Sequence, residues 1–291
     1  MPEPTPEKLN IQWFPGHMTK ARRMIEDNLK LVDAVCELLD ARIPGASRNP
    51  DIDRLVGEKP RLVILNRTDL ADPALTRRWA DYYKSKGLAV LETDARSGKG
   101  VSGFVPAVRA LLKDKIAANE AKGMGGKPLR IMILGIPNVG KSTFINKVAR
   151  RRAAAAGDRP GLTRGRQWIG IDSSLDLLDT PGVLWPRFDS QEVGELLALT
   201  NAIKADVLDR ETLGANFMLR LRALYPQAVE QRYKFTPDPA MNGFELLETA
   251  ARKRGFLVSG GECDTERMAN VLLNEYHEGK LGRITLEEPH D

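Results

Sequence analysis

Residues 135–142 read Gly-Ile-Pro-Asn-Val-Gly-Lys-Ser, and this stretch decides the fold. It fits the pattern G-x-x-x-x-G-K-[ST] of a phosphate-binding P-loop. The apolar run at 129–134 before it predicts a buried strand, and residues 142–148 after it predict the start of a helix. In that order several backbone N–H groups and a helix N-terminus converge on one point, which is a ready site for an anion.

The composition bounds the class of protein. A chain of 291 residues exceeds one average domain, so two domains are expected. Hydrophobic residues make up 42% and charged residues 29%, as in ordinary soluble proteins, and no apolar run is long enough to span a bilayer. The two cysteines, Cys36 and Cys263, cannot build a disulfide framework. The acidic, apolar-poor beginning of the chain fits neither a secretory signal nor an Arg-rich transit peptide, so we expect a cytoplasmic protein.

The charge is distributed unevenly along the chain. The net charge is +5 overall, but residues 188–291 carry −6 and residues 1–187 therefore carry +11. A basic surface favours polyanionic partners. We expect this surface to belong mainly to the part of the chain that holds the P-loop.

Hydrophobic patterns outline two domains. Apolar runs predict strands, and apolar residues at spacings of three and four predict helices. The hydrophobic pattern changes near residue 188, after which only helical patterns occur. We therefore predict a domain at 1–187 and a small all-helical domain at 188–291. The expected strands are 32–39, 62–65, 88–91, 129–134, 167–171 and 175–178, and the expected helices of the first domain are 18–32, 74–86, 101–121 and the one after the P-loop.

The stretch Asn66-Arg67-Thr68-Asp69 predicts the base of the nucleotide. The Asp69 carboxylate, placed after an apolar strand, can accept hydrogen bonds from the N1–H and 2-amino groups of guanine. Adenine lacks that pair of donors, so the pattern favours GTP. Asn-x-x-Asp alone is weak, because both residues favour turns. Arg67 stands where Lys is usual, and its guanidinium can stack over the base, so we expect altered affinity with guanine specificity kept.

Two further segments complete a GTPase set. Asp179-Thr180-Pro181-Gly182 fits the D-x-x-G motif that follows a strand in GTPases. Asp179 would hold Mg²⁺ through water, and the Gly182 N–H would meet the γ-phosphate. Thr163 is the expected switch threonine that closes on Mg²⁺ and the γ-phosphate, and Asp94-Ala95 is the second motif on the base side.

The order of these motifs is unusual. The base-reading segments at 66–69 and 94–95 precede the P-loop at 135–142, which precedes 179–182. In an ordinary small GTPase the P-loop comes first. The same parallel sheet forms if the N- and C-termini of an ordinary small GTPase are joined and the chain is opened elsewhere. The glycine-rich link at 122–127 suits that join. The predicted fold is therefore α/β, a circularly permuted P-loop GTPase domain with helices on both faces of a mostly parallel sheet, followed by a small all-helical domain.

At this point the chain resembles the YlqF/RbgA family, the circularly permuted GTPases of ribosome biogenesis. The resemblance rests on Trp-Phe-Pro-Gly-His-Met at 13–18, Asp-Ala-Arg-Ile-Pro at 40–44, the permuted order and the C-terminal stretches 260–262 and 279–287. It implies a GTP-dependent factor for late assembly of the large ribosomal subunit, whose helical C-terminal domain contacts ribosomal RNA. The chain departs from the family at Arg67 and at Asp94-Ala95-Arg96.

The resemblance also bears on catalysis. Many GTPases place a glutamine after D-x-x-G to orient the attacking water, but here that position is Val183, so intrinsic hydrolysis should be slow. The family implies that His17 supplies this function, since a neutral imidazole can orient water at physiological pH. It also implies a K⁺ ion beside the phosphates, linked to Asn138.

The expected site residues follow from these motifs. The expected catalytic residues are His17, Lys141 and Thr163. Mg²⁺ is assigned to Ser142, Thr163 and Asp179, and K⁺ to Asn138. The nucleotide is assigned to Asn66, Arg67, Asp69, Asp94, Ala95, Pro137, Asn138, Val139, Gly140, Lys141, Ser142, Thr143, Thr163, Asp179 and Gly182.

The leading functional hypothesis is a monomeric factor that binds the large ribosomal subunit in its GTP state and leaves after hydrolysis, with no role for membrane or DNA. Phosphate attraction would supply much of its RNA affinity. One alternative is a GTPase switch that acts on a protein partner without RNA. In that case the acidic helical domain would bind the partner. Another is an ATP-using P-loop enzyme, against which the 66–69 segment argues.

Overall fold

The computed structural model describes residues 17–149, 167–180, 182–184, 188, 190–203 and 209–289, with the side chains of 17–22 and 167 left out. Within these residues the chain forms two compact units. One contains residues 188–286, and the other contains the residues up to 184 together with 287–289. Each unit has its own hydrophobic core and is described by itself.

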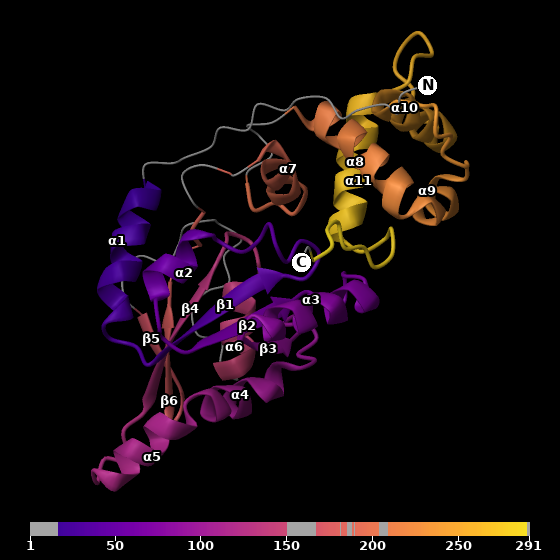
Figure 1. Cartoon of the computed structure of the whole chain (residues 1–291). Helices are drawn as coiled ribbons and strands as arrows, with labels where there is room; N and C mark the ends of the chain where they lie inside the picture. Colours follow the sequence, from indigo (N-terminus) through magenta and orange to yellow (C-terminus); the bar gives the residue numbers. More distant parts are fainter. Residues whose placement is uncertain are drawn as a thin grey trace. The chain divides into compact units, whose positions relative to one another are not determined.

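The larger unit is built on a sheet of six described strands in the order β3-β2-β1-β4-β6-β5 (Figure 1). All neighbouring pairs are parallel except β5 and β6, which form an antiparallel pair. The strands are β1 (Ala34–Asp40), β2 (Arg61–Asn66), β3 (Ala89–Glu92), β4 (Leu129–Gly135), β5 (Gln167–Asp172) and β6 (Leu175–Asp179). The mostly parallel sheet predicted from the permuted motif order is confirmed.

Strand order explains how the permuted chain closes its site. β4, which leads into the P-loop, pairs with β1, and β1 pairs with β2, which leads into the 66–69 segment. Parallel strands end at the same edge of a sheet, where ligands bind in open α/β folds. The order of the motifs along the chain therefore does not matter for their meeting in space.

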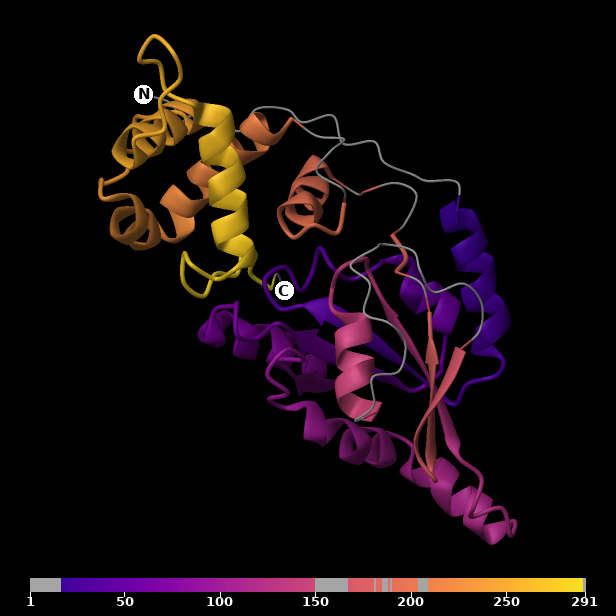
Figure 2. The same ribbon diagram turned by 180° about the vertical axis from the view of Figure 1, so that it is seen from behind.

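Helices cover both faces of this sheet (Figures 1 and 2). Alternate residues of β1 and β2, including Val35, Leu39 and Val63, pack with α1 (His17–Leu29), α2 (Asp51–Val56) and α3 (Pro73–Ser85). On the opposite face α6 (Lys141–Ala149) meets α4 (Phe104–Leu111), and the rings of Phe104 and Phe144 contact edge to face at 5.2 Å. The P-loop helix is thus fixed by an aromatic contact.

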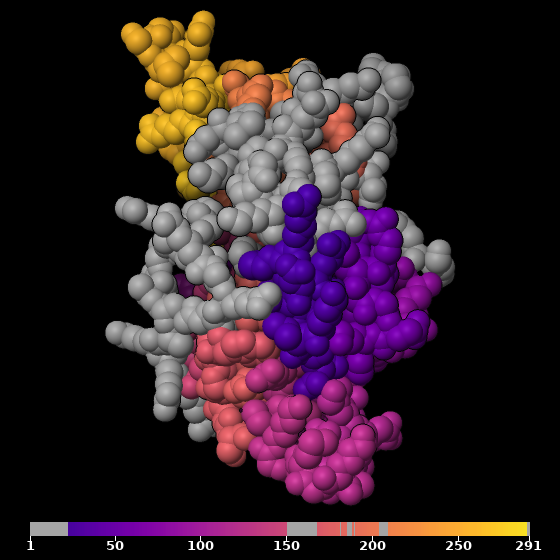
Figure 3. Space-filling model, turned by 90° about the vertical axis from the view of Figure 1, so that its left-hand side faces the viewer, coloured from indigo at the N-terminus to yellow at the C-terminus, as the bar shows by residue number. Residues whose placement is uncertain are grey.

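Two local expectations were wrong or incomplete. The segment 101–121, predicted as one helix, is a 3₁₀ turn (Val101–Gly103) followed by α4 and α5 (Lys113–Ala121), with a break at Leu112 whose φ of −108° leaves the helical region. Leu112 is buried, and α5 buries no residue. Packing of Leu112 therefore ends one helix where local propensity would continue it. Figure 3 shows α5 standing out from the end of this unit. Helix α2 lies between the expected strands 32–39 and 62–65, where no helix was predicted.

The end of the chain packs on the larger unit. Glu287 accepts hydrogen bonds from the backbone N–H groups of Gly45 and Ala46, and its own carbonyl accepts from the Trp79 indole at 3.1 Å. A Cβ at Gly45 would lie 2.9 Å from the Trp79 ring. Glycine is therefore required where the tail and the ring meet the loop after β1.

The smaller unit is helical: α7 (Gln191–Leu199), α8 (Arg210–Leu224), α9 (Pro226–Tyr233), α10 (Gly243–Arg254) and α11 (Thr265–His277). Helix α8 is buried on nearly every side, as the central helix of a small bundle must be. A Cβ on Gly214 would lie 2.6 Å from that of Ala269, so a small residue lets α8 and α11 approach closely. Asp264 caps α11 by accepting a hydrogen bond from the Arg267 N–H.

No helix among the described segments is long and apolar enough to cross a membrane.

Candidate functional site

The P-loop joins the end of β4 to the start of α6 through two residues in the left-handed region. Asn138 has a φ of 58° and Gly140 a φ of 98°. A Cβ on Gly140 would lie 2.7 Å from the Asn66 amide nitrogen, and one on Gly135 would lie 2.7 Å from the Leu38 carbonyl oxygen. Neither position has room for a side chain, so close approach requires glycine at both, and the positive φ of Gly140 also favours glycine there.

Lys141 is the charged group of this loop. Its ammonium donates to the carbonyls of Gly135 at 3.1 Å and Ile136 at 3.0 Å, so it lies back over the loop that it follows. The residue is 8% exposed. Burial lowers the pKa of Lys141 to about 8, although the nearby Asp179 carboxylate opposes that shift. An ammonium held with so little water interacts strongly with a phosphate.

Asn66 connects three motifs. Its side-chain amide donates to the Val139 carbonyl in the P-loop at 2.9 Å. Its side-chain oxygen accepts from the Ala95 N–H at 3.0 Å and from the Thr93 hydroxyl at 3.2 Å. Both ends of this buried amide are thus satisfied within the protein. The structure brings the two base-side segments and the P-loop together through one side chain.

Asp94 shapes the loop after β3. Its carboxylate accepts from the backbone N–H groups of Arg96 at 2.8 Å and Ser97 at 3.2 Å. Partial burial opposes ionisation, but the hydrogen bonds from Ser97 and Arg96 outweigh it and lower the pKa of Asp94. The acidic residue that departs from the family pattern therefore fixes its own loop and leaves the Ala95 N–H directed at Asn66.

The proposed base-reading and metal-binding side chains remain accessible. Asp69 is exposed and, among the described residues, makes no hydrogen bond or ion pair. Ser142 and Thr143, at the start of α6, are also exposed. A carboxylate and two hydroxyls at one edge of the sheet are thus available to a ligand.

The D-x-x-G segment lies on the P-loop. The Thr180 hydroxyl donates to the Ile133 carbonyl at 2.6 Å, and the Val183 N–H donates to the Gly135 carbonyl at 3.2 Å. A Cβ on Gly182 would lie 2.8 Å from the backbone nitrogen of Pro137 and 3.1 Å from the Lys141 ammonium. Glycine is therefore required at 182, and its backbone lies beside the Lys141 ammonium.

Val183 does not take part in water chemistry. It is 8% exposed and packs in the core cluster with Ile25, Leu134 and Leu178. Helix α1 begins at His17, but the His17 side chain lies outside the described residues, as does Thr163. The structure thus places the backbone of the expected water-orienting residue at the N-terminus of α1.

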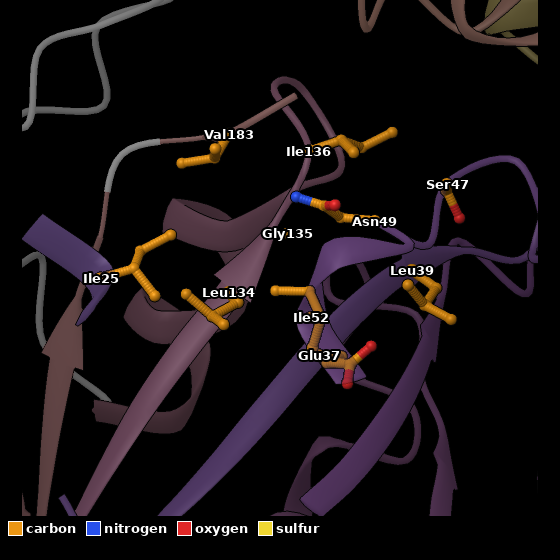
Figure 4. Close-up of a pocket in the computed structure, with 10 residues that line it drawn as sticks. All are labelled: Ile25, Glu37, Leu39, Ser47, Asn49, Ile52, Leu134, Gly135, Ile136 and Val183. Atoms are coloured by element: carbon orange, nitrogen blue, oxygen red, sulfur yellow. The ribbon is translucent and has the colours of Figure 1, made fainter. Parts of the chain in front are cut away.

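A small cavity lies beside the P-loop on the face covered by α1 and α2 (Figure 4). Its wall is mainly apolar and includes Ile25, Leu134 and Val183, with the Glu37 carboxylate at one side. Burial raises the pKa of Glu37, partly offset by the facing arginines Arg48 and Arg61. Gly135 and Ile136 of the P-loop line this cavity, but none of the residues assigned to the nucleotide does.

Sequence reasoning did not assign a role to the polar residues of β1. Glu37 and Asp40 are buried within a strand that is otherwise apolar, and Arg42 just beyond it is fully buried. The signal was present, because charged residues are almost never fully buried unless paired. Arg42, the partner of Asp40, is only two residues away, but Arg61 and Arg67 come from a different part of the chain and could not be assigned from local sequence.

Comparison with known proteins gives a consistent result. A family model described as "50S ribosome-binding GTPase" matches residues 130–213. The chain is 45% identical to Ribosome biogenesis GTPase A of Priestia megaterium over 97% of its own length and 98% of that protein. It is 38% identical to Mitochondrial ribosome-associated GTPase 1 of Mus musculus, over 95% and 90% of the two chains.

Two solved structures are similar over nearly the whole chain. The GDP-bound structure of YlqF from Thermotoga maritima matches with a TM-score of 0.64 and 29% identity, covering 92% of this chain and all of that one. The GNP-bound YlqF structure from T. maritima matches with a TM-score of 0.63 and 30% identity, covering 94% and 99%. The arrangement of strands and loops described above is thus shared with proteins that were solved with guanine nucleotides.

Proposed function

This chain belongs to the ribosome biogenesis GTPase A family, and on that premise we propose that it assists assembly of the large ribosomal subunit, binding the subunit in its GTP state and leaving after hydrolysis. As a member of this family it binds guanine nucleotide, hydrolyses GTP and takes part in ribosome biogenesis. The observation that carries the proposal is the convergence of Gly182, the P-loop and Lys141 at one edge of the sheet.

The proposed nucleotide site uses the residues of that edge. The P-loop N–H groups of 137–143 and the Lys141 ammonium would hold the phosphates, and the exposed Asp69 carboxylate would pair with guanine. Asn66 and Ala95 would hold the base-side loops in register, because their hydrogen bond joins the two segments. The steric fit supports this assignment, since a side chain at 135, 140 or 182 would clash with neighbouring protein atoms. Only glycine lets the backbone segments at this edge lie so close together.

The proposed metal sites depend on the same edge. Mg²⁺ would be held by Ser142, by Thr163 and through water by Asp179, together with phosphate oxygens, and would neutralise charge that develops on the phosphates. Among the described residues no cluster of three or more His, Cys, Asp or Glu side chains could hold a metal by itself. This accords with an ion bound jointly by protein and nucleotide. K⁺ would lie beside Asn138, whose positive φ turns the loop there.

The proposed hydrolysis follows from what each residue can do. Lys141 and the Gly182 N–H stabilise charge on the γ-phosphate, and Thr163 closes over it. Val183 is packed in the core, so His17 is the proposed residue that orients the attacking water. Because Val183 cannot replace the usual glutamine, turnover of the protein alone should be slow, and the ribosomal subunit would raise it.

The proposed division of labour follows the two units. Residues 1–187 would bind and hydrolyse GTP, and 188–291 would contact ribosomal RNA and proteins of the large subunit. The proposed protein is a monomer that works in the cytoplasm, where bacterial ribosomes assemble, and does not use DNA. Phosphate contacts from the basic larger unit would make binding salt-dependent.

GTP turnover in K⁺ buffer, with and without purified large ribosomal subunits, tests this proposal. We expect a rise of on the order of tenfold or more, since supplied catalytic groups contribute up to roughly 10³–10⁵. Small subunits at the same concentration are the control and should leave turnover unchanged. Immature large subunits form a third arm.

No rise with either form of the large subunit, while GTP binding stays intact, would reject the ribosomal part of the proposal. It would favour the alternative of a switch that acts on a protein partner. His17→Ala would separate catalysis from docking, because we expect it to abolish the stimulated rate while subunit binding is retained. Equal turnover in Na⁺ and K⁺ buffers would rule out the K⁺ assignment.

A further inference from the structure

The Asp-Ala-Arg segment after β1 carries a buried ion pair that the hydrolysis mechanism does not use. The Asp40 carboxylate accepts from both the Nε and the NH2 group of Arg42, at 2.9 and 2.8 Å, and from the Arg42 backbone N–H at 3.0 Å. The Arg42 side chain is fully buried and that of Asp40 is 2% exposed. A two-point contact of this kind fixes the plane of the carboxylate as well as its position.

A second arginine approaches the same carboxylate from the base-side loop. β1 and β2 end side by side, with Asp40 opposite Asn66, so the residue after Asn66 lies next to Asp40. The Nε group of Arg67 lies 3.7 Å from Asp40 Oδ2. Arg42 and Arg67 together favour ionisation against the cost of burial and lower the pKa of Asp40. The carboxylate is therefore charged at neutral pH and can hold both cations.

Arg67 continues from Asp40 to the P-loop. Its NH2 group donates to the Asn138 backbone carbonyl at 2.5 Å. The φ of Arg67 is 62°, a left-handed conformation that is uncommon for residues other than glycine. Contacts with the surrounding residues must hold this conformation. The contacts of the Arg67 guanidinium with Asp40 and with the Asn138 carbonyl are among them.

We propose that Asp40 is a positioning residue for guanine nucleotide binding, which holds Arg67 so that its guanidinium joins the base-side loop to the P-loop. This inference rests on the proposed nucleotide site. Arg42 is the fixed base of the arrangement, because it locks the orientation of Asp40. Asp40 touches no ligand in this arrangement and acts only through Arg67.

The same geometry gives a reason for arginine at position 67. A guanidinium presents separate N–H groups in a rigid fork, so Nε can face Asp40 while NH2 reaches Asn138. An ammonium is a single point charge on a flexible stem and cannot span two acceptors in fixed directions. In this chain the substitution of the usual lysine is thus matched to a charged Asp40 at the end of the neighbouring strand.

A double-mutant cycle on the full chain tests the proposal, with the equilibrium Kd of a fluorescent GDP analogue and the steady-state KM and kcat for GTP as readouts. The variants are Asp40→Asn, Arg67→Met and the pair combined. We expect each single variant to raise Kd and KM about tenfold with kcat changed less than about twofold, which is the size of one hydrogen bond to a charged group. The combined variant should be no weaker than Arg67→Met alone.

Further variants separate positioning from general stability. Arg67→Lys should recover part of the affinity lost in Arg67→Met, because one of the two contacts can re-form. Arg77→Met, which removes an exposed arginine on α3, is the matched control and should change nothing. The melting temperature of each variant shows whether the fold is intact.

Two results would overturn the inference. One is an equal loss of affinity from Asp40→Asn in the native and Arg67→Met backgrounds, which would mean that Asp40 acts through the fold alone. The other is an unchanged Kd in Arg67→Met, which can be read even if Asp40→Asn fails to fold, because the Arg67 side chain is 28% exposed. If the native protein bound no guanine nucleotide at all, the proposed function itself would fail.

Discussion

Two buried charged side chains, Glu275 in the helical unit and Lys141 in the larger unit, are held by different kinds of partner. In the helical unit, Glu275 of α11 accepts from Arg232 of α9 at 2.5 Å, from Arg254 of α10 at 2.9 Å and from the Tyr233 hydroxyl at 2.8 Å. At the nucleotide edge of the larger unit, the Lys141 ammonium donates to two backbone carbonyls and, within the described residues, forms no ion pair. The charge of Glu275 is thus balanced by two arginines, whereas the charge of Lys141 has no ion-pair partner among the described residues.

The pKa shifts show what this difference means. Burial opposes ionisation of Glu275, but Arg232, Tyr233 and Arg254 outweigh it, so the pKa of Glu275 is lowered and its charged form is stabilised. Burial likewise lowers the pKa of Lys141, to about 8, and this disfavours its charged form. Glu275 holds three helices together, whereas the protein keeps Lys141 charged at a cost that a bound phosphate would offset. The four predictions below test this contrast.

Removing the unbalanced charge should have the largest effect. In Lys141→Met we expect the affinity for GTP to fall at least about a hundredfold, because a charge-assisted contact to phosphate of about 3 kcal/mol is lost. Stability should change by less than about 1 kcal/mol, since the variant also removes the cost of burying an amine. Isothermal titration with GTP and a thermal melt measure the two quantities. Lys147→Met, on the exposed side of α6, is the control, and an equal loss there would remove the special role of Lys141.

Breaking the neutralised cluster should give the opposite pattern. Glu275→Gln leaves two arginines without their carboxylate, and we expect the helical unit to lose about 2 kcal/mol, below the full value for a buried pair because Arg232 and Arg254 are 33% and 30% exposed. The Kd for GTP should stay within about twofold. Denaturant unfolding followed by circular dichroism is the measurement. Because the pKa of Glu275 is lowered in the folded protein, this stabilisation is fully present above the ordinary glutamate pKa of about 4.3 and is lost as the pH falls through the lowered pKa.

The next largest effect should be a pH dependence of GTP affinity that comes from Lys141. Because the pKa of Lys141 is about 8 without ligand, binding of an anionic nucleotide above that pH requires uptake of a proton. We expect the affinity for GTP to fall by up to about tenfold per pH unit between roughly 8 and 10. The sign is reversed for folding, since the unfolded lysine binds its proton more tightly, so the ligand-free protein should gain stability over the same range. Calorimetry in two buffers of different ionisation enthalpy would detect the proton, and binding that is independent of pH up to 9.5 in native protein contradicts the assignment.

The smallest expected effect comes from removing the Tyr233 hydroxyl that donates to Glu275. Tyr233→Phe removes one neutral donor from Glu275 and leaves both arginines in place. We expect a loss of about 1 kcal/mol in the free energy of unfolding, the usual size of one hydrogen bond, with no change in nucleotide affinity. Tyr82→Phe, at a half-buried position on α3, is a matched control expected to cost less. A loss as large as that of Glu275→Gln would show that the hydroxyl, and not the ion pairs, holds the cluster together.

Local signals in the sequence were strong enough to predict much of the larger unit. The strand before the P-loop and the strand pair predicted at 167–171 and 175–178 follow from apolar runs, and the structure contains them as β4, β5 and β6. The break at Leu112 and helix α2 were missed, because the first depends on burial of one leucine and the second follows a loop without a clear periodic pattern. The assignments of Thr163 and of the His17 side chain stay predictions.

The sequence by itself determined which chemical groups are present and in what order: a P-loop, a guanine-type segment, a D-x-x-G segment and the permutation that places the second before the first. Only the tertiary structure decided which of them touch. Asn66 meets Val139 and Arg67 meets Asp40 because β1, β2 and β4 are neighbours in the sheet, although residues 66 and 139 are 73 positions apart. Spacing along a chain fixes strands and helices through local geometry, whereas contacts between loops depend on the pairing of strands, which is set by burial of the whole sheet.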